Sequence, residues 1–115
     1  MIENSSRDAA GLLPLTPALF HVLLSLAEGG KHGYAILKEV ESRTNGDVVL
    51  STGTLYGIIK RLLADGLIRE SASRSDERRT AYRLTAFGRK VALAEADRLR
   101  TLVVAAEKLF RELAV

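Results

Sequence analysis

Hydroxyl-bearing and cationic side chains recur along one segment, residues 51–65. Its donors are Ser51, Thr52, Thr54, Tyr56 and Lys60. Short hydroxyl groups and cations donate to phosphate oxygens and to the base edges exposed in the major groove of DNA. In a helix these groups share one face, because apolar residues occupy the other face at helical spacing. The pattern favours a helix that inserts into a major groove, and an ordinary surface helix is the alternative.

The second face of this segment is apolar and predicts how the helix is anchored. Its members recur at helical spacing: Leu55, Ile58, Ile59, Leu62 and Leu63. Ser51 or Thr52 can cap the start of the helix by accepting from free backbone N–H groups, and Asp65-Gly66 marks its end. One side of the helix is therefore expected in a core, which leaves the donor-bearing side outside.

Two helices are expected before this segment. Thr16-Pro17 is a typical helix start, and that helix should end at Glu28-Gly29-Gly30. A second helix follows His32-Gly33-Tyr34, buries a stripe that includes Ile36 and Val40, and should end at Asn45-Gly46. Three helices joined by short turns form a helix-turn-helix, with the third helix in the reading position.

A β-hairpin is expected behind the third helix. Residues 67–71 and 78–84 read as strands, and residues 72–77 form a polar turn between them. Such a hairpin is a wing, and three arginines cluster around its tip: Arg74, Arg78 and Arg79. Phosphate or minor-groove contacts are available to a wing tip, whereas a solvated charged loop is the alternative.

A long helix is expected over residues 86–113, with Thr85 as its N-cap. Its apolar stripe consists of Leu99, Leu102, Val103, Ala106, Leu109, Phe110 and Leu113. A compact winged domain is too small to cover the far half, and burial of each such side chain contributes ~1.5–3 kcal/mol. We therefore predict a homodimer in which the last helices pack together; folding back onto the first helix is the alternative.

The predicted fold class is mainly α with a small β-hairpin, a winged helix-turn-helix followed by a long C-terminal dimerisation helix. We expect a flexible tail over residues 1–11, the DNA-binding domain over 12–85 and the dimerisation helix over 86–115. A chain of 115 residues with 47% hydrophobic and 27% charged residues has room for one folded domain. The net charge of +3 is compatible with a nucleic-acid partner.

Several other classes are disfavoured by composition. The chain has no cysteine and two histidines, so no disulfide or cysteine-based metal site can form, and we predict no metal and no cofactor. Neither histidine belongs to a recognisable catalytic motif, so we do not predict an enzyme. No secretory signal or membrane-length apolar run is present, which predicts a cytoplasmic protein with no membrane partner.

Five short motifs together resemble the PadR family of bacterial transcriptional regulators, over about residues 15–110. They are His32-Gly33-Tyr34, Thr54-Leu55-Tyr56, Lys60-Arg61-Leu62, Asp65-Gly66-Leu67-Ile68 and Tyr82-Arg83-Leu84-Thr85-Ala86-Phe87-Gly88. The short tail after the wing resembles the small subfamily with one C-terminal dimerisation helix. The resemblance implies a dimeric winged-helix repressor that binds a palindromic DNA operator and is released by a small-molecule or stress signal.

The resemblance also implies roles for individual residues. Tyr34 would donate to a phosphate, the donors of residues 52–60 would face the groove, and Arg78 and Arg79 would lie on the wing. Core packing is the alternative for Tyr34 and Tyr56, and Tyr82 is expected to pack the wing onto the helices. A winged-helix adaptor that binds proteins without specific DNA recognition is the alternative function.

This chain departs from the family pattern at three places. Gly57 stands where many relatives have proline, and Thr80-Ala81 stands where many have a basic residue followed by tyrosine. Tryptophan is absent, so the aromatic sandwich that some small members use to hold flat drugs cannot be carried over. An apolar pocket at the dimer interface could still hold a small apolar effector, formed by Ala92, Ala96, Leu99 and their symmetry mates with Phe20 nearby.

Overall fold

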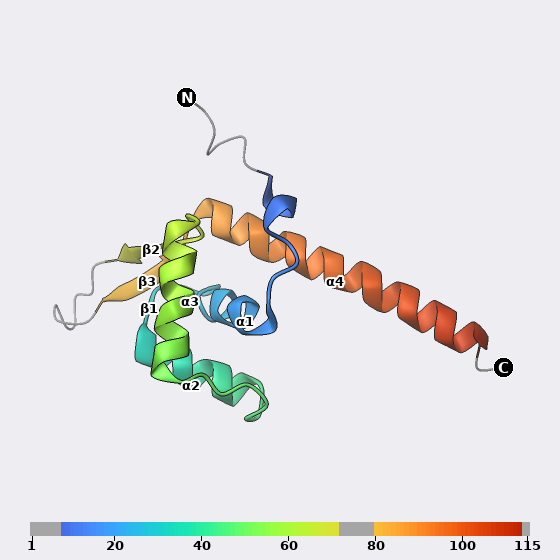
Figure 1. Ribbon diagram of the computed structural model, residues 1–115, viewed down its shortest axis with the longest axis horizontal. Helices are drawn as coiled ribbons and strands as arrows, with labels where there is room; N and C mark the ends of the chain where they lie inside the picture. Colours follow the sequence, from blue (N-terminus) through green and yellow to red (C-terminus); the bar gives the residue numbers. More distant parts are fainter. Residues whose placement is uncertain (1–7, 72–79, 114–115) are drawn as a thin grey trace.

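The structure is a computed structural model that describes residues 8–71 and 80–113 (Figure 1). The elements in chain order are η1 (Ala9–Leu12), α1 (Pro17–Ser25), β1 (Lys31–His32), α2 (Gly33–Arg43), α3 (Thr52–Ala64), β2 (Ile68–Ser71), β3 (Ala81–Leu84) and α4 (Ala86–Leu113). The predicted class, mainly helical with a small antiparallel sheet and a long last helix, is confirmed.

Hydroxyl side chains cap three of the helices, as the sequence predicts. Thr16 accepts a hydrogen bond from the Leu19 amide at 3.2 Å, and Ser51 accepts from the Thr54 amide at 3.1 Å. Thr85 accepts from the Gly88 amide at 2.9 Å. Each cap satisfies one of the amides that a helix start leaves without a partner within the helix.

Helix α1 ends at Ser25, before the predicted Glu28-Gly29-Gly30 stop. The Lys31 ammonium group donates to the Ser25 carbonyl at 2.6 Å, so this orphan carbonyl of the helix end is satisfied by a side chain. The chain then passes through the glycines into β1, a two-residue strand that the sequence does not predict. A strand this short carries no alternation from which it could be recognised.

The sheet is antiparallel, with strand order β1-β3-β2. The predicted pairing of β2 with β3 is confirmed, with Ile68 opposite Leu84 and Arg69 opposite Arg83. Strand β1 adds to the other edge of β3, where Lys31 lies opposite Tyr82. The wing is therefore joined through its returning strand to the segment that leads into α2.

The core lies between the three N-terminal helices, the sheet and the first half of α4. From α3 it receives Leu55, Ile59 and Leu62, with Ile58 and Leu63 partly buried beside them. Tyr82 is buried in the same cluster, which confirms that it packs the wing onto the helices. The apolar side of α3 is thus held by the core over the whole length of the helix.

The turn after α3 is bonded directly to the start of α4. The Thr85 hydroxyl donates to the Gly66 carbonyl at 2.6 Å, and the Thr85 amide donates to the Leu67 carbonyl at 3.1 Å. A side chain at Gly88 would collide with that same Leu67 carbonyl, so the close approach requires glycine. The contact fixes the direction of α4 relative to the end of α3.

The expectation of a loose tail over residues 1–11 does not hold for its last residues. Residues 9–11 lie in η1, which packs against α4, and Ala9 is 4% exposed. Asp8 caps this turn by accepting from the Ala10 amide at 2.9 Å. The long helix offers an apolar surface here, and the sequence pattern of the tail gives no sign of that distant partner.

A buried carboxylate holds the segment before α1 against α4. Glu95 is 2% exposed and accepts two hydrogen bonds from Arg98, at 2.7 and 2.9 Å, and one from the Leu15 amide at 3.2 Å. The hydrogen bonds from Arg98 lower the pKa of Glu95 below its ordinary value, against the opposing effect of burial, and the Leu15 amide lowers it further. This contact ties a residue from the start of the chain to the middle of α4.

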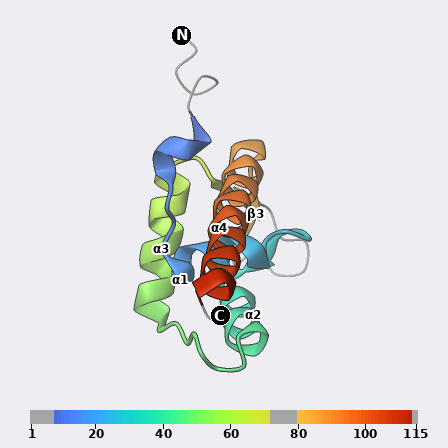
Figure 2. The same cartoon turned by 90° about the vertical axis from the view of Figure 1, so that its right-hand side faces the viewer.

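The far half of α4 leaves the body of the molecule. Figure 1 shows α4 passing above α1 and then extending alone toward the C-terminus, and in Figure 2 this end of the helix points toward the viewer. Residues 99–112 are all exposed, whereas Val91 and Glu95 are buried. None of the helices in the described residues is long and apolar enough to span a membrane.

Candidate nucleic-acid interface

The outer face of α3 is open to solvent. Thr52, Thr54, Tyr56 and Lys60 are all exposed, as are Gly57, Arg61 and Ala64 beside them. Figure 2 shows α3 at the left edge of the molecule, with α4 and β3 to its right. The core therefore holds the apolar side of α3 while its hydroxyl and cationic donors stand on an unobstructed surface.

Ser51 has a defined structural task at the start of this face. Its hydroxyl accepts from the Thr54 amide and donates to the Thr54 hydroxyl at 3.0 Å. A hydroxyl oxygen can accept a further bond, but the Ser51 proton is already used within the chain. Thr54 keeps its own hydroxyl proton, so Thr54 is the better donor of the two.

Tyr56 is half packed and half exposed. Its side chain is 46% exposed, and its ring lies over Gly33 at the start of α2. A Cβ atom at position 33 would stand 2.5 Å from the Tyr56 hydroxyl oxygen, so the ring could not keep this position beside a larger residue. The His-Gly-Tyr and Leu-Tyr motifs therefore meet in space, and together they set the position of this tyrosine on α3.

Tyr82, on β3, is an electrostatic neighbour of Tyr56. Burial raises the pKa of Tyr82 above its ordinary value, and the nearby Tyr56 and Glu70 raise it further. Glu70 lies opposite Tyr82 in the sheet. The face of the sheet that carries this pair is thus turned toward α3.

Tyr34 stands free of the core on the first turn of α2. It is 65% exposed, and the Lys38 ammonium group lies 5.9 Å from the centre of its ring. Core packing, the alternative raised for Tyr34, is excluded by this exposure. A hydroxyl and a cation side by side near a helix start form a surface suited to a phosphate group.

A network of polar side chains fixes α2 against α1. Glu39 pairs with Lys31 at 2.7 Å and with Arg43 at 3.1 Å, and Arg43 also donates to the Ser25 hydroxyl and the His21 carbonyl, each at 2.9 Å. The hydrogen bond from Lys31 is the largest cause that lowers the pKa of Glu39. These bonds fix the position of α2, which carries Tyr34 and also Gly33, the residue that the Tyr56 ring contacts.

The wing tip is the part of the predicted interface that lies outside the described residues. Arg74, Arg78 and Arg79 all fall within 72–79, so their contacts stay predictions. The strands on either side are described, from Ile68 to Ser71 and from Ala81 to Leu84.

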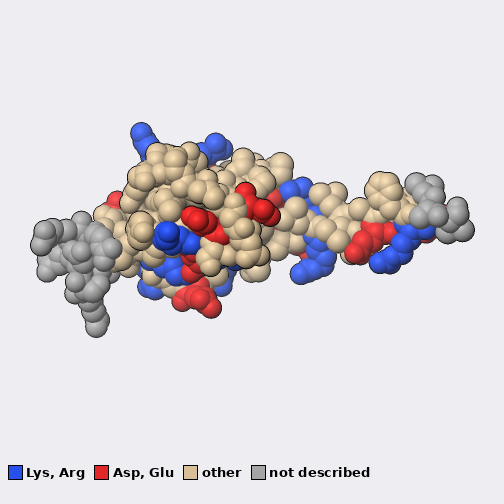
Figure 3. Space-filling view, turned by 90° about the horizontal axis from the view of Figure 1, so that it is seen from below, with Lys and Arg blue, Asp and Glu red and all other residues tan. Residues whose placement is uncertain are grey.

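The predicted dimerisation stripe lies on the protruding part of α4. Its exposed large members are Leu99, Leu102, Val103, Leu109 and Phe110. Ala106 is exposed among them, Leu113 lies in the helix but its side chain is outside the described residues, and Val104 is an exposed apolar residue that the stripe did not include. Figure 3 shows the charged side chains of this arm gathered toward one edge, which leaves the other edge to uncharged residues.

No three His, Asp or Glu side chains within 8–71 and 80–113 converge into a group that could hold a metal ion. The residues suggested for an apolar effector pocket are Phe20 on α1 and Ala92, Ala96 and Leu99 on α4, and these two helices contact each other. Leu99 is exposed. Phe20, Ala92 and Ala96 are partly buried. The effector itself stays a prediction.

The fold and its exposed third helix define the class, a winged helix-turn-helix with an appended long helix. A family model described as "Transcriptional regulator PadR-like family" matches residues 22–94. The chain therefore belongs to the PadR-like family of transcriptional regulators. No curated protein matches the chain in a sequence search.

Solved structures share this architecture. A transcriptional regulator from Clostridium thermocellum is 29% identical with a TM-score of 0.69, covering 78% of this chain and 89% of that chain. A PadR family transcription regulator from Clostridium difficile is 22% identical with a TM-score of 0.67, covering 80% of this chain and 96% of that one. RosR from H. salinarum is 23% identical with a TM-score of 0.63, covering 87% of this chain and 98% of that one.

Proposed function

We propose that this PadR-like regulator binds a palindromic DNA operator as a homodimer, acts as a repressor, and is released by a small-molecule or stress signal. The observation that carries the proposal is the outer face of α3. Thr52, Thr54 and Lys60 are exposed together on a helix whose other side is anchored in the core. Such a rigid, donor-rich helix is suited to reading base edges in a major groove.

Dimerisation is supported by the exposed arm of α4. Leu99, Leu102, Ala106 and Leu109 follow one another at spacings of three and four residues, which is the pattern of a coiled-coil seam. A soluble chain rarely leaves such a continuous apolar stripe uncovered. Pairing of two arms about a two-fold axis would place two α3 helices on one duplex, with half-sites about 34–36 Å apart.

An adaptor that binds proteins is the competing function. An adaptor helix would present apolar side chains to its partner. The outer face of α3 instead presents threonines, Lys60 and Arg61, and its one large apolar ring, Tyr56, is half packed against Gly33. The chemistry of this face therefore favours DNA.

The test is a binding titration of the full chain against genomic fragments and against random duplexes of equal length. The expected result is preference for particular fragments, with log affinity falling linearly with log salt at a slope of ~0.9 per phosphate contact. Lys60→Ala should weaken binding and lower the slope, whereas Lys108→Ala removes the same charge from the far end of α4 and should not. Equal affinity for every duplex, or no effect of Lys60→Ala, would contradict the proposal.

A further inference from the structure

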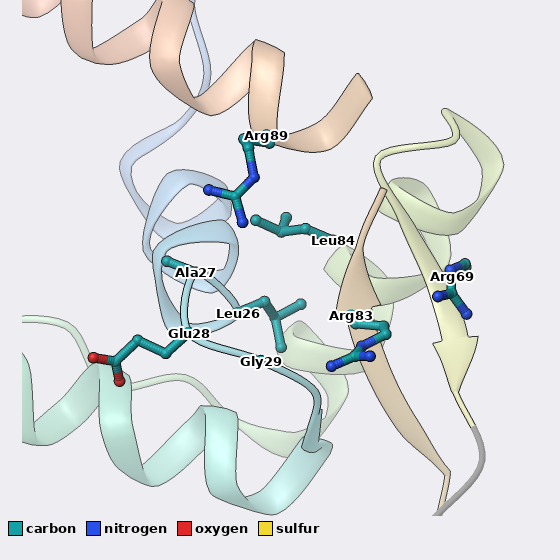
Figure 4. A pocket seen from close by; sticks show the side chains of 8 residues that line it. All are labelled: Leu26, Ala27, Glu28, Gly29, Arg69, Arg83, Leu84 and Arg89. Carbon is teal, nitrogen blue, oxygen red and sulfur yellow. The ribbon is translucent and has the colours of Figure 1, made fainter. Parts of the chain in front are cut away.

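Three arginines from separate elements line one hollow between the winged domain and the start of α4. The hollow measures about 250 Å³ and lies between the end of α1, the sheet and the start of α4 (Figure 4). Its cationic lining consists of Arg69 from β2, Arg83 from β3 and Arg89 from the first turns of α4. Arg69 and Arg89 are 20 positions apart in the sequence, and the fold brings both to the lining of this hollow.

The hollow lies on the far side of the sheet from α3. Arg69 and Arg83 are register partners, so their side chains share one face of the sheet. Their neighbours Glu70 and Tyr82 occupy the other face, the one turned toward Tyr56 of α3. The arginine site is therefore separate from the surface proposed to read DNA.

The charges around the hollow are not neutralised within the described residues. No ion pair or hydrogen bond joins the guanidinium groups of Arg69, Arg83 or Arg89 to another described side chain. Glu28 is the acidic residue of the lining, but its carboxylate points away from Arg83 and Arg89 in Figure 4. Like charges gathered in one place repel each other, and a bound anion would remove that repulsion.

Arg83 runs close to the backbone at the end of the α1–β1 connection. Its guanidinium lies along the Gly29-Gly30 backbone: Nη2 is 3.9 Å from where a Cβ atom at Gly29 would stand, and Nε is 3.5 Å from the equivalent point at Gly30. A planar guanidinium with a fixed orientation binds an oxyanion through two parallel hydrogen bonds. Arg89 adds a second cation near the start of α4, where the helix dipole also favours negative charge.

We propose that this hollow binds a small phosphate-bearing molecule, at a site distinct from both the DNA-reading face and the apolar dimer interface. The ligand would bridge the base of the wing to the start of α4. Arg83 supplies a planar fork of donors, and Arg69 and Arg89 supply further donors to the phosphate oxygens. Pyrophosphate is a suitable probe, because it carries several charges and fits a hollow of this size.

The experiment is calorimetric titration of the DNA-free full chain with pyrophosphate at constant ionic strength. The expected result is saturable binding at one site per chain. Arg83→Gln and Arg89→Gln should each weaken that binding by about tenfold or more, as loss of a charge-assisted hydrogen bond implies. Arg100→Gln is the matched control, since it removes the same charge from an exposed position on α4, and it should change affinity less than about twofold.

A variant of opposite sign sharpens the test. Glu28→Gln removes the acidic charge from the lining and should strengthen pyrophosphate binding. Thermal melts check that each variant is folded, and the exposed Arg89 keeps the test valid if Arg83→Gln fails to fold.

Three results would overturn the site. They are heat that never saturates, an equal loss in Arg100→Gln, and displacement of pyrophosphate by a short duplex whose own binding falls in the Arg83 and Arg89 variants. The last result would make the DNA backbone the occupant. Since the main titration contains no DNA, its failure would leave operator binding standing.

Discussion

Substitution of Leu102 by glutamine tests whether α4 pairs with a second copy of itself. Leu102 is 53% exposed in the single chain, so the substitution removes few contacts within the fold. Glutamine is nearly as good a helix former as leucine, so α4 should persist. An effect of Leu102→Gln on self-association would therefore come from the contact between two chains.

The size of the effect follows from that exposed fraction. Full burial of a leucine side chain contributes ~1.5–3 kcal/mol, and roughly half of this remains available at Leu102. A two-fold axis uses the residue twice, which gives about 1.5–3 kcal/mol per dimer and a dissociation constant raised by ~10–150-fold. Burial of the new amide group at the seam would add to this cost.

Sedimentation equilibrium over a range of concentrations measures the dissociation constant directly. Lys108→Gln is the matched control: it introduces the same side chain on the charged side of the same arm, and it should leave the constant within about twofold. Pairing of α4 with a second copy is refuted if the unmodified chain is monomeric at high micromolar concentration. It is equally refuted if the two variants shift the constant by the same amount.

Two further perturbations address α3 and the Glu95 contact. A Cβ atom at Gly57 would meet nothing within 4 Å, so Gly57→Ala should raise the free energy of unfolding by up to ~1 kcal/mol. Chemical denaturation measures this change. An unchanged or lower free energy of unfolding would mean that the helix is strained at position 57. The pKa of Glu95 is lowered, so its ionised form stabilises the fold above the ordinary value of 4.5 and that stability is lost as pH falls through the lowered pKa. Glu95→Gln should destabilise the protein at neutral pH and flatten the acid limb of the curve of stability against pH, and two parallel curves would contradict the assignment.

The helices of this protein can be predicted from the sequence because the capping residues and the apolar periodicity indicate the same elements. Thr16, Ser51 and Thr85 each precede an apolar repeat, and each caps the helix that the repeat predicts. The face of α3 that carries Thr52 and Lys60 is exposed for the same reason, since the apolar residues between them leave one orientation for the helix. Periodicity alone therefore defines the candidate DNA-reading surface.

Features that depend on contacts between residues far apart in the sequence cannot be predicted in this way. Strand β1 exists because β3 offers a free edge, and the arginine hollow exists because the register places Arg69 opposite Arg83. The packing of Ala9 depends on α4, and Glu95 of α4 is satisfied by the Leu15 amide, 80 residues earlier in the chain. A glutamate within an apolar helix face gives no local indication that an amide and an arginine will satisfy it.

The joint between α3 and α4 links the two halves of the proposed function. Thr85 donates hydrogen bonds to the Gly66 and Leu67 carbonyls in the turn that ends α3. Gly88 of α4 packs directly against the Leu67 carbonyl, with no room for a side chain between them. The direction of α4 is thus set by the same residues that end α3. The arms would pair beyond Leu99, at a distance from α3. Because the joint between α4 and α3 is fixed, a small rotation where the arms pair would produce a larger displacement of the two α3 helices. A signal that changes how the arms pair would therefore alter the separation of the reading helices, and with it the fit to a palindrome, without touching any residue on α3 itself.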